Sequence, residues 1–390
     1  MAKKQKKEVE KKAADPRQIG RELIKKHGSK LIVRGDEFIK RKEIIVSVSP
    51  AIDVHLGGGI PQGSNVLLAG KKKVGKTVTS LSIAANGQKH GMNVYFLNIE
   101  GRLKKRDVTG IKGLDAKMLY VIGSFKEDDG VGGKVDGKIL TGEEWLSIAE
   151  HWIHEDPGCI IILDSVSQLA TEKEMNADIG DRTGDGGFRL LAQFTKRNAN
   201  TIPVQKCIVI GIQHVLANTN PNTSKYFSTF RSGGNKVGYA VDVDLECVKM
   251  EPWRIDEKDK ESEQIGQKIT WKTGSTAITA PGRKMISMLR YGTGLDRVAE
   301  LFELGTNFGL IDRNGAWYTL VYMSKYTDVL GMEWETKFDK KKEDDVLAPE
   351  LSALVKRQVF SNILGLLYEK PEYADCLEKE IQGLLGYESN

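Results

Sequence analysis

The chain has 390 residues, of which 40% are hydrophobic and 28% are charged, and its net charge at pH 7 is +5. These values describe an ordinary globular protein with one large core and smaller appendages. No apolar run is long enough to cross a bilayer, and none near the N-terminus could serve as a signal peptide, so we expect no membrane insertion. The four scattered cysteines include no C-x-x-C pair, which excludes a zinc ribbon and a disulfide framework. We expect a reduced, cytoplasmic protein.

The positive charge is concentrated near the N-terminus. Residues 1–45 hold 15 Lys/Arg against 7 Asp/Glu, so the rest of the chain is slightly acidic. The Lys3–Lys12 run is typical of a disordered solubilising tail and equally of an arm that contacts nucleic acid. A helix is predicted after Pro16, and a strand at 44–49; one helix face carries Ile19, Leu23 and Ile24. This arm is too small to fold alone, so its apolar face should dock on the core or on a neighbouring subunit.

Strand and helix patterns alternate from about residue 50. The apolar strand segments are 66–69, 94–99, 118–122, 159–163, 207–212 and 241–248. Helical stretches separate most of the early strands, which predicts an α/β fold with a mostly parallel, twisted sheet covered on both faces. Residues 124–139 form a glycine- and charge-rich excursion, and a charged loop is predicted at 338–345. We predict three parts, namely a basic tail with an oligomerisation segment, a core, and a C-terminal domain, at 1–45, 46–296 and 297–390.

The most informative motif is Gly-Lys-Lys-Lys-Val-Gly-Lys-Thr at residues 70–77, which matches the phosphate-binding pattern G-x-x-x-x-G-K-[ST]. The glycines permit a tight turn whose amides point at a phosphate, and the helix that follows begins at that phosphate. Lys76 would pair with the β and γ phosphates, and the hydroxyl of Thr77 with Mg²⁺. A lysine-rich surface turn is the alternative. The predicted ATP-binding residues are Gly70, Lys71, Lys72, Lys73, Val74, Gly75, Lys76, Thr77 and Val78.

Polar residues follow three of the predicted strands. Asp164 comes after 159–163, where a carboxylate holds the Mg²⁺ hydration shell; a helix cap is the alternative. Glu100 comes after 94–99 and could polarise the attacking water, or could simply begin the next helix. Gln213 could hydrogen-bond a γ-phosphate, or could be a structural amide. We expect Lys76, Glu100 and Gln213 to be catalytic, and Thr77 and Asp164 to be the Mg²⁺ ligands.

Two long polar loops predict contact with nucleic acid. The loop 174–187 precedes a helix with one polar, cationic face, which includes Gln193. A helix face that is simply exposed to solvent would show the same pattern. The loop 214–232 interleaves cations with aromatic residues, which suits a single strand with stacked bases, and the following glycines offer amides to phosphate. The predicted DNA-binding residues are Met175, Ile179, Arg182, Arg189, Lys196, Arg197, Lys225, Phe227, Phe230, Arg231, Ser232, Gly233, Gly234 and Asn235.

Together these segments resemble the RecA recombinase family, including phage recombinases of the UvsX type. The resemblance runs through roughly residues 45–300 and reappears near the C-terminus. It is carried by the order and spacing of six short motifs, at 60–63, 162–169, 174–181, 233–235, 291–294 and 315–318.

The resemblance implies a RecA-like P-loop ATPase core with an N-terminal oligomerisation arm and a small α+β C-terminal domain. It implies a helical filament on single-stranded DNA that pairs with a homologous duplex and exchanges strands, with DNA-stimulated ATP hydrolysis. Single-stranded-DNA-binding and loader proteins are the implied partners, in the host cytoplasm if the chain is phage-encoded.

The resemblance also implies roles for individual residues. Glu100 would be the catalytic glutamate, Gln213 the γ-phosphate sensor and Tyr239 an aromatic residue at the subunit interface. Lys272 and Lys284 are candidates for the lysines that reach the neighbour's ATP. The segment after Glu100 departs from the family because it lacks an aromatic residue to stack on adenine. The alternatives are a RecA-fold ring helicase or accessory repair ATPase, and a non-catalytic DNA-coating protein switched by nucleotide.

Overall fold

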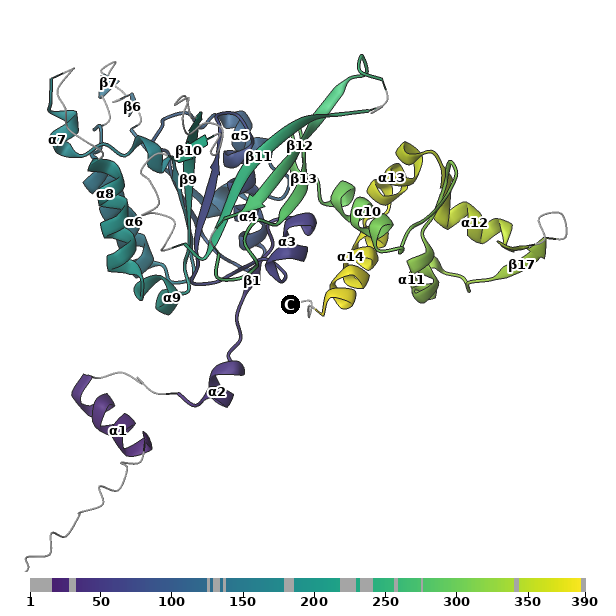
Figure 1. Cartoon of the computed structure of the whole chain (residues 1–390), viewed down its shortest axis with the longest axis horizontal. Helices are drawn as coiled ribbons and strands as arrows, with labels where there is room; N and C mark the ends of the chain where they lie inside the picture. The colour runs from purple at the N-terminus through teal and green to yellow at the C-terminus, as the bar shows by residue number, and fades with distance from the viewer. Residues whose placement is uncertain are drawn as a thin grey trace, which may run out of the picture. The chain divides into compact units, whose positions relative to one another are not determined.

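The computed structural model describes residues 16–27, 33–124, 127–128, 134–135, 138–178, 186–217, 229–231, 241–255, 259–274, 276–339 and 344–386. The chain divides into two units, residues 1–43 and 44–390 (Figure 1). Among the described residues, no helix is both long and apolar enough to span a membrane.

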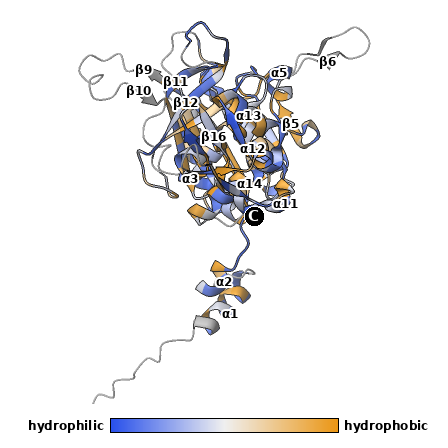
Figure 2. Cartoon of the chain, turned by 90° about the vertical axis from the view of Figure 1, so that its right-hand side faces the viewer, coloured by the Kyte–Doolittle hydropathy of each residue, from blue (hydrophilic) through white to orange (hydrophobic). Residues whose placement is uncertain are grey.

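The first unit contains two short helices. The helix predicted after Pro16 is confirmed as α1 (Pro16–His27), and α2 spans Gly35–Ile39. Hydrophobic and hydrophilic residues lie side by side on both helices (Figure 2). Four of the apolar side chains are exposed to solvent, namely Ile19, Ile24, Phe38 and Ile39.

The strand predicted at 44–49 is wrong in its extent. Only β1 (Ile45–Val46) is extended and paired, with β2 (Ile60–Pro61), and helix α3 (Pro50–Leu56) begins soon afterwards. The carboxylate of Asp53, in the first turn of α3, accepts hydrogen bonds from the hydroxyl of Ser47 at 2.5 Å and the amide of Val48 at 2.9 Å. These bonds tie residues 47 and 48, which follow the strand, to the first turn of α3.

One large sheet dominates the second unit. Its order is β14-β13-β12-β11-β3-β9-β8-β4-β5, and β10 pairs with β9. The strands from β11 to β5 pair in parallel, whereas β11 to β14 pair antiparallel, so the predicted α/β fold is confirmed. The bounds are β3 (Asn65–Gly70), β4 (Val94–Leu97), β5 (Leu119–Ile122), β8 (Ile160–Asp164), β9 (Ile208–Ala217), β10 (Thr229–Arg231), β11 (Val243–Arg254), β12 (Gln264–Thr273), β13 (Lys284–Arg290) and β14 (Gly294–Leu295).

Alternate side chains of the central strands fill two separate cores. Leu68 points to the core that contains α3 and α4 (Lys76–Gln88), and its neighbour Leu67 points to the other. The second core packs against α6 (Gly142–Glu155), α8 (Gly186–Asn198) and α9 (Thr201–Gln205), which lie on one side of the sheet in Figure 1. Period-two burial on both faces explains why these strands read as continuous apolar runs.

Figure 1 shows β11 and β12 extending as a long hairpin beyond the other strands. The remaining elements of this region are short. Strands β6 (Glu127–Asp128) and β7 (Lys134–Val135) form a two-stranded sheet within the excursion predicted at 124–139. The others are α5 (Lys105–Thr109), α7 (Glu172–Met175) and the 3-10 turns Ala116–Met118 and Val166–Gln168.

The C-terminal region has its own apolar core and mixes helices with small sheets. The charged loop predicted at 338–345 is wrong at its two ends, because 338–339 and 344–345 belong to the antiparallel pair β17 and β18, and residues 340–343 lie outside the described residues. Charge does not prevent such pairing, because the ladder needs only backbone groups. The elements are α10 (Arg297–Asn307), β15 (Asp312–Asn314), β16 (Trp317–Thr319), the 3-10 turn Val321–Lys325, α11 (Thr327–Leu330), β17 (Thr336–Asp339), β18 (Asp344–Leu347), α12 (Pro349–Val355), β19 (Lys356–Gln358), α13 (Phe360–Glu369) and α14 (Pro371–Leu385).

A buried carboxylate joins this region to the sheet. Glu300 of α10 accepts hydrogen bonds from the backbone amides of Ala51 at 3.0 Å and Met288 at 2.8 Å. Burial raises the pKa of Glu300 to about 7. The same side chain therefore links α10 to both α3 and β13.

Candidate functional site

The predicted site residues meet at one edge of the sheet. Strands β3, β9 and β8 are parallel neighbours, and Ala69 lies opposite Gln213 while Asp164 lies opposite Ile212. The carboxyl ends of these strands are therefore level, which is where open α/β sheets bind ligands. Strand β4 ends two residues earlier than predicted, at Leu97, so Glu100 lies in the turn that follows.

The loop that links β3 to α4 is seated on the apolar core. Gly75 is the N-cap of α4 and has a left-handed backbone, with φ of 86°. A Cβ at this position would lie 2.8 Å from methyl carbons of Ile269 and Leu289. Glycine therefore satisfies both the backbone geometry and the space available.

Lys76 bends back into this loop. Its buried ammonium donates hydrogen bonds to the carbonyl oxygens of Gly70 at 2.9 Å and Lys71 at 2.6 Å. Burial lowers the pKa of Lys76 to about 8, although the carboxylates of Asp164 and Glu100 act in the opposite direction. A phosphate in the concavity of the loop would supply the anion that this partly desolvated cation lacks.

Thr77 and Asp164 form a pair of oxygen donors. The hydroxyl of Thr77 donates to the Oδ2 atom of Asp164 at 2.8 Å, although the two residues lie 87 positions apart. Burial raises the pKa of Asp164, and the bond from Thr77 and the charge of Lys76 oppose that shift. A hydroxyl beside a carboxylate, both at the mouth of a phosphate loop, fits the hard oxygen ligands that Mg²⁺ requires.

Glu100 is held by three side chains. Its Oε1 atom accepts from the Ser165 hydroxyl at 2.7 Å and makes a short contact with Nε2 of His214, and the guanidinium of Arg102 lies 3.4 Å from Oε2. Burial raises the pKa of Glu100, but these three partners outweigh burial, so the pKa lies below its ordinary value. The carboxylate is therefore ionised at neutral pH, as a residue that polarises water must be.

His214 and Ser165 are site residues that the sequence reading did not identify. Each directly follows a residue that was identified, Gln213 and Asp164. The side chain of Gln213 is buried, whereas the ring of His214 reaches Glu100. Successive strand residues point to opposite faces of a sheet. The position directly after each predicted residue was therefore the sequence signal that could have identified Ser165 and His214. The amide of His214 also donates to the hydroxyl of Ser167 at 2.9 Å.

The described DNA-binding candidates are spread over three elements. Met175 is exposed at the end of α7, and Arg189 is exposed in the first half of α8. Lys196 and Arg197 lie in the last turn of α8, and the guanidinium of Arg197 pairs with Glu150 of α6 at 3.1 Å. Phe230 and Arg231 belong to β10, opposite Leu216 and Val215 of β9.

The other candidates lie outside the described residues. They are Ile179, Arg182, Lys225, Phe227, Ser232, Gly233, Gly234, Asn235 and the interface residue Tyr239.

The two interface lysines are neighbours in space. Lys272 of β12 is the register partner of Lys284 of β13, and both are exposed. Directly opposed residues of antiparallel strands share one face of the sheet. The structure therefore brings together two cations that the sequence offered as separate candidates.

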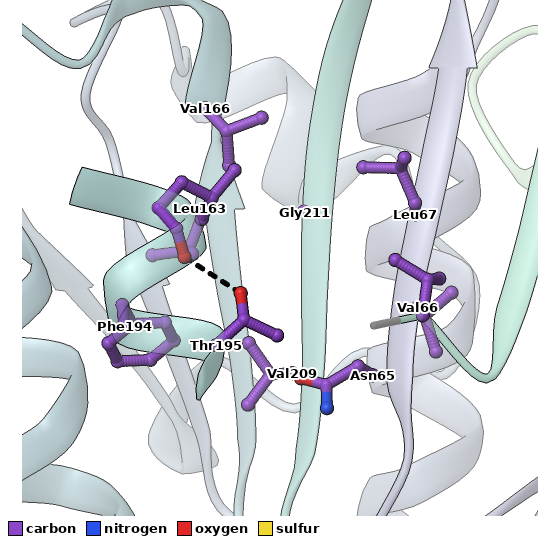
Figure 3. Close-up of a pocket in the computed structure, with 11 residues that line it drawn as sticks. Asn65, Val66, Leu67, Leu163, Val166, Phe194, Thr195, Val209 and Gly211 are labelled. Carbon is purple, nitrogen blue, oxygen red and sulfur yellow. Dashed lines mark hydrogen bonds between the residues drawn. The ribbon is translucent and has the colours of Figure 1, made fainter. Parts of the chain in front are cut away.

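A small cavity lies on the face of the sheet that packs against α8. It has a volume of about 30 Å³ and lies between α8 and strands β3, β8 and β9, with Asn65, Val66, Val209 and Phe194 in its wall (Figure 3). The hydroxyl of Thr195 is satisfied by the carbonyl of Leu191 at 2.8 Å. A space of about one water molecule with mostly apolar walls is a packing gap and not a ligand site.

The fold and the phosphate loop define a P-loop nucleotide-binding protein of the α/β class. A family model described as the RecA N-terminal domain matches residues 17–296, which is more than half of the chain. The chain belongs to the RecA family of DNA recombination and repair proteins, which bind ATP and DNA.

Relatives agree with this assignment. The chain is 27% identical to the protein named RecA from Xanthomonas axonopodis pv. citri (strain 306) over 300 residues, which cover 76% of this chain and 81% of the relative. The RecA proteins of Xanthomonas euvesicatoria pv. vesicatoria (strain 85-10) and Xanthomonas campestris pv. campestris (strain B100) match with the same identity and coverage.

Proposed function

We propose that this protein is a DNA-dependent ATPase that forms helical filaments on single-stranded DNA, pairs that strand with a homologous duplex and exchanges strands. The observation that carries the proposal is the convergence of Lys76, Thr77, Asp164 and Glu100 at one sheet edge within a RecA-family core. These residues fill the roles that ATP hydrolysis requires, which argues against a non-catalytic switch.

Each residue of the site has a task in hydrolysis. The loop amides and Lys76 would bind the phosphates, and Thr77 with Asp164 would hold Mg²⁺, which would supply charge neutralisation at the phosphate oxygens. Glu100, ionised and fixed by Ser165 and His214, orients the attacking water and accepts its proton. Gln213 is the proposed γ-phosphate sensor, because its strand β9 carries the chain from this edge toward residues 218–228.

Nucleic acid and neighbouring protomers are the proposed partners. Arg189 and Met175 stand exposed on the elements that flank residues 176–185 and are suited to contact a single strand. The exposed apolar residues of α1 and α2 support an arm at 1–45 that docks on a second copy of the chain. Lys272 and Lys284 are proposed to reach the neighbour's ATP.

The proposal has further parts that rest on the family assignment. The core would span residues 46–296 and the C-terminal domain 297–390. Single-stranded-DNA-binding and loader proteins are proposed as partners, and the cytoplasm as the location.

Negative-stain electron microscopy tests the proposal directly. The protein is incubated with single-stranded DNA and a slowly hydrolysed ATP analogue, beside a sample without nucleotide. Long helical filaments that form only with nucleotide are expected. Closed rings would favour the ring helicase, and no assembly would favour an accessory ATPase; either result would overturn the filament.

A further inference from the structure

Glu174 joins two segments that are far apart along the chain. Its Oε2 atom accepts hydrogen bonds from the amide and the hydroxyl of Thr171, at 2.7 and 2.9 Å. Its Oε1 atom accepts from the amide of Gly186 at 2.9 Å, 12 residues away. One carboxylate thus ties the start of α7 to the first residue of α8.

Only part of this arrangement is local. The hydroxyl of Thr171 also accepts from the amide of Glu174 at 3.1 Å, so the two residues form a capping box on the four-residue helix α7. A capping box needs no contact with α8. The bond to Gly186 is therefore the part that a local helix cap does not explain.

The start of α8 is packed tightly against the same segment. A Cβ at Gly186 would lie 2.6 Å from the methyl carbon of Thr171, and a Cβ at Gly187 would lie 1.9 Å from the carbonyl oxygen of Leu169. Both glycines are buried. Close backbone approach at these two residues brings the Gly186 amide to the carboxylate.

Charge favours the same geometry. Burial raises the pKa of Glu174, but the amides of Thr171 and Gly186, the Thr171 hydroxyl and the charge of Arg189 outweigh burial, so the pKa lies below its ordinary value. The ionised carboxylate sits at the first turn of the 13-residue helix α8, where the helix dipole stabilises negative charge.

Two exposed DNA-binding candidates flank this carboxylate. Met175 is the next residue in the chain, and Arg189 lies about one helical turn after Gly186. The hydrogen bonds of Glu174 link the short helix that carries Met175 to the first residue of the helix that carries Arg189.

We propose that Glu174 is a positioning residue that holds Met175 and Arg189 in one arrangement for contact with single-stranded DNA, an inference that rests on the proposed function. Glu174 itself does not touch the strand. It acts by fixing α7 against the first turn of α8.

The test uses Glu174→Gln in the full-length protein. Glutamine also serves in a capping box, so the bond from the Thr171 amide is kept, while the amide group of glutamine opposes the Gly186 amide. Glu172→Gln is the matched control, because Glu172 is exposed on the same short helix and the change in charge is identical. Glu174→Asp, which keeps the charge and shortens the side chain, replaces the glutamine variant if that variant fails to fold.

Binding is measured by fluorescence anisotropy of a labelled oligodeoxythymidine with Mg²⁺ and a slowly hydrolysed ATP analogue, over a range of salt. We expect Glu174→Gln to weaken binding roughly tenfold, because a factor of about ten corresponds to the contribution of one charge-assisted hydrogen bond. The salt slope should fall by about 0.7, the value for one lost phosphate contact to a single strand. Glu172→Gln should bind as the wild type does.

Combined variants separate positioning from a general structural effect. If Glu174 acts through Met175 and Arg189, then adding Glu174→Gln to a protein that carries Met175→Ala and Arg189→Ala weakens binding no further. Additive losses, or wild-type binding by Glu174→Gln, would overturn the inference and leave the proposed function intact. A wild-type protein that does not bind the oligonucleotide would overturn both.

Discussion

Glu100 at the sheet edge and Glu300 at the junction with the C-terminal helices are both held by hydrogen bonds, but their partners differ. Glu100 contacts a hydroxyl, an imidazole and a guanidinium, and its pKa is lowered. Glu300 is fully buried, accepts from two backbone amides, and its pKa is raised to about 7 by burial.

The difference separates chemistry from architecture. Three polar side-chain partners keep Glu100 ionised although its side chain is only 11% exposed, near the phosphate loop. Backbone amides fix the place of Glu300 but cannot offset its loss of water. Changes at the first carboxylate should therefore alter turnover, and changes at the second should alter stability and its dependence on pH.

Lys76→Ala should have the largest effect at the sheet edge. Loss of the one buried loop cation should reduce ATP hydrolysis about 10³-fold, to near background, because the phosphates lose a preorganised charge. The measurement is phosphate release with DNA present. Lys117→Ala, which removes an exposed lysine just before the amino end of β5, should retain hydrolysis. Normal turnover by Lys76→Ala would show that the loop is not the ATP site.

Glu100→Gln should reduce hydrolysis about 10²-fold while ATP binding is retained, because the amide cannot accept a proton from water. Filaments assembled with ATP should therefore persist on DNA. Dissociation after dilution, followed by light scattering, gives the lifetime. Rapid hydrolysis by this variant would remove Glu100 from the role of base.

Glu300→Gln should change the pH dependence of unfolding. The folded-state pKa of Glu300 lies above its ordinary value, so its stabilising contribution is complete below about pH 4.5 and is lost as pH rises through about 7. The wild type should thus lose on the order of 2 kcal/mol relative to the variant between pH 5 and pH 8. Thermal unfolding at several pH values measures this difference. Parallel curves for the two proteins would contradict it.

Ser165→Ala should have the smallest effect. It removes one of the three partners of Glu100, so hydrolysis should fall by about 3- to 10-fold, the usual value of one hydrogen bond. The pKa of Glu100 should move upward, and the acid limb of the pH–rate profile should move with it. An unmoved acid limb would show that the hydroxyl does not act on the carboxylate.

Much of the sheet edge could be predicted because its signals are local. The phosphate loop is a contiguous motif, and Asp164 is visible as the polar residue that ends an apolar run. The contact between His214 and Glu100 spans 114 residues, and that between Ala51 and Glu300 spans 249. No local pattern specifies which of many polar residues will meet across such distances, because strand order and register decide it.

The errors in the fold have a similar cause. The strand predicted at 44–49 was cut short by the carboxylate of Asp53, and the hairpin of β17 and β18 forms through backbone pairing between charged segments. In each case a hydrogen-bonding partner outweighed the composition of the segment.

In evolutionary terms, the phosphate loop divides into positions fixed by the core and positions free to change. Gly75 leaves no room for a side chain because methyl groups of Ile269 and Leu289 lie against it. Residues 71–73 face solvent, and all three are lysines, but Lys73 has a left-handed backbone with φ of 63° that restricts its replacement. Mutation can therefore adjust the charge around the phosphates most freely at residues 71 and 72, without disturbing the apolar core beneath them.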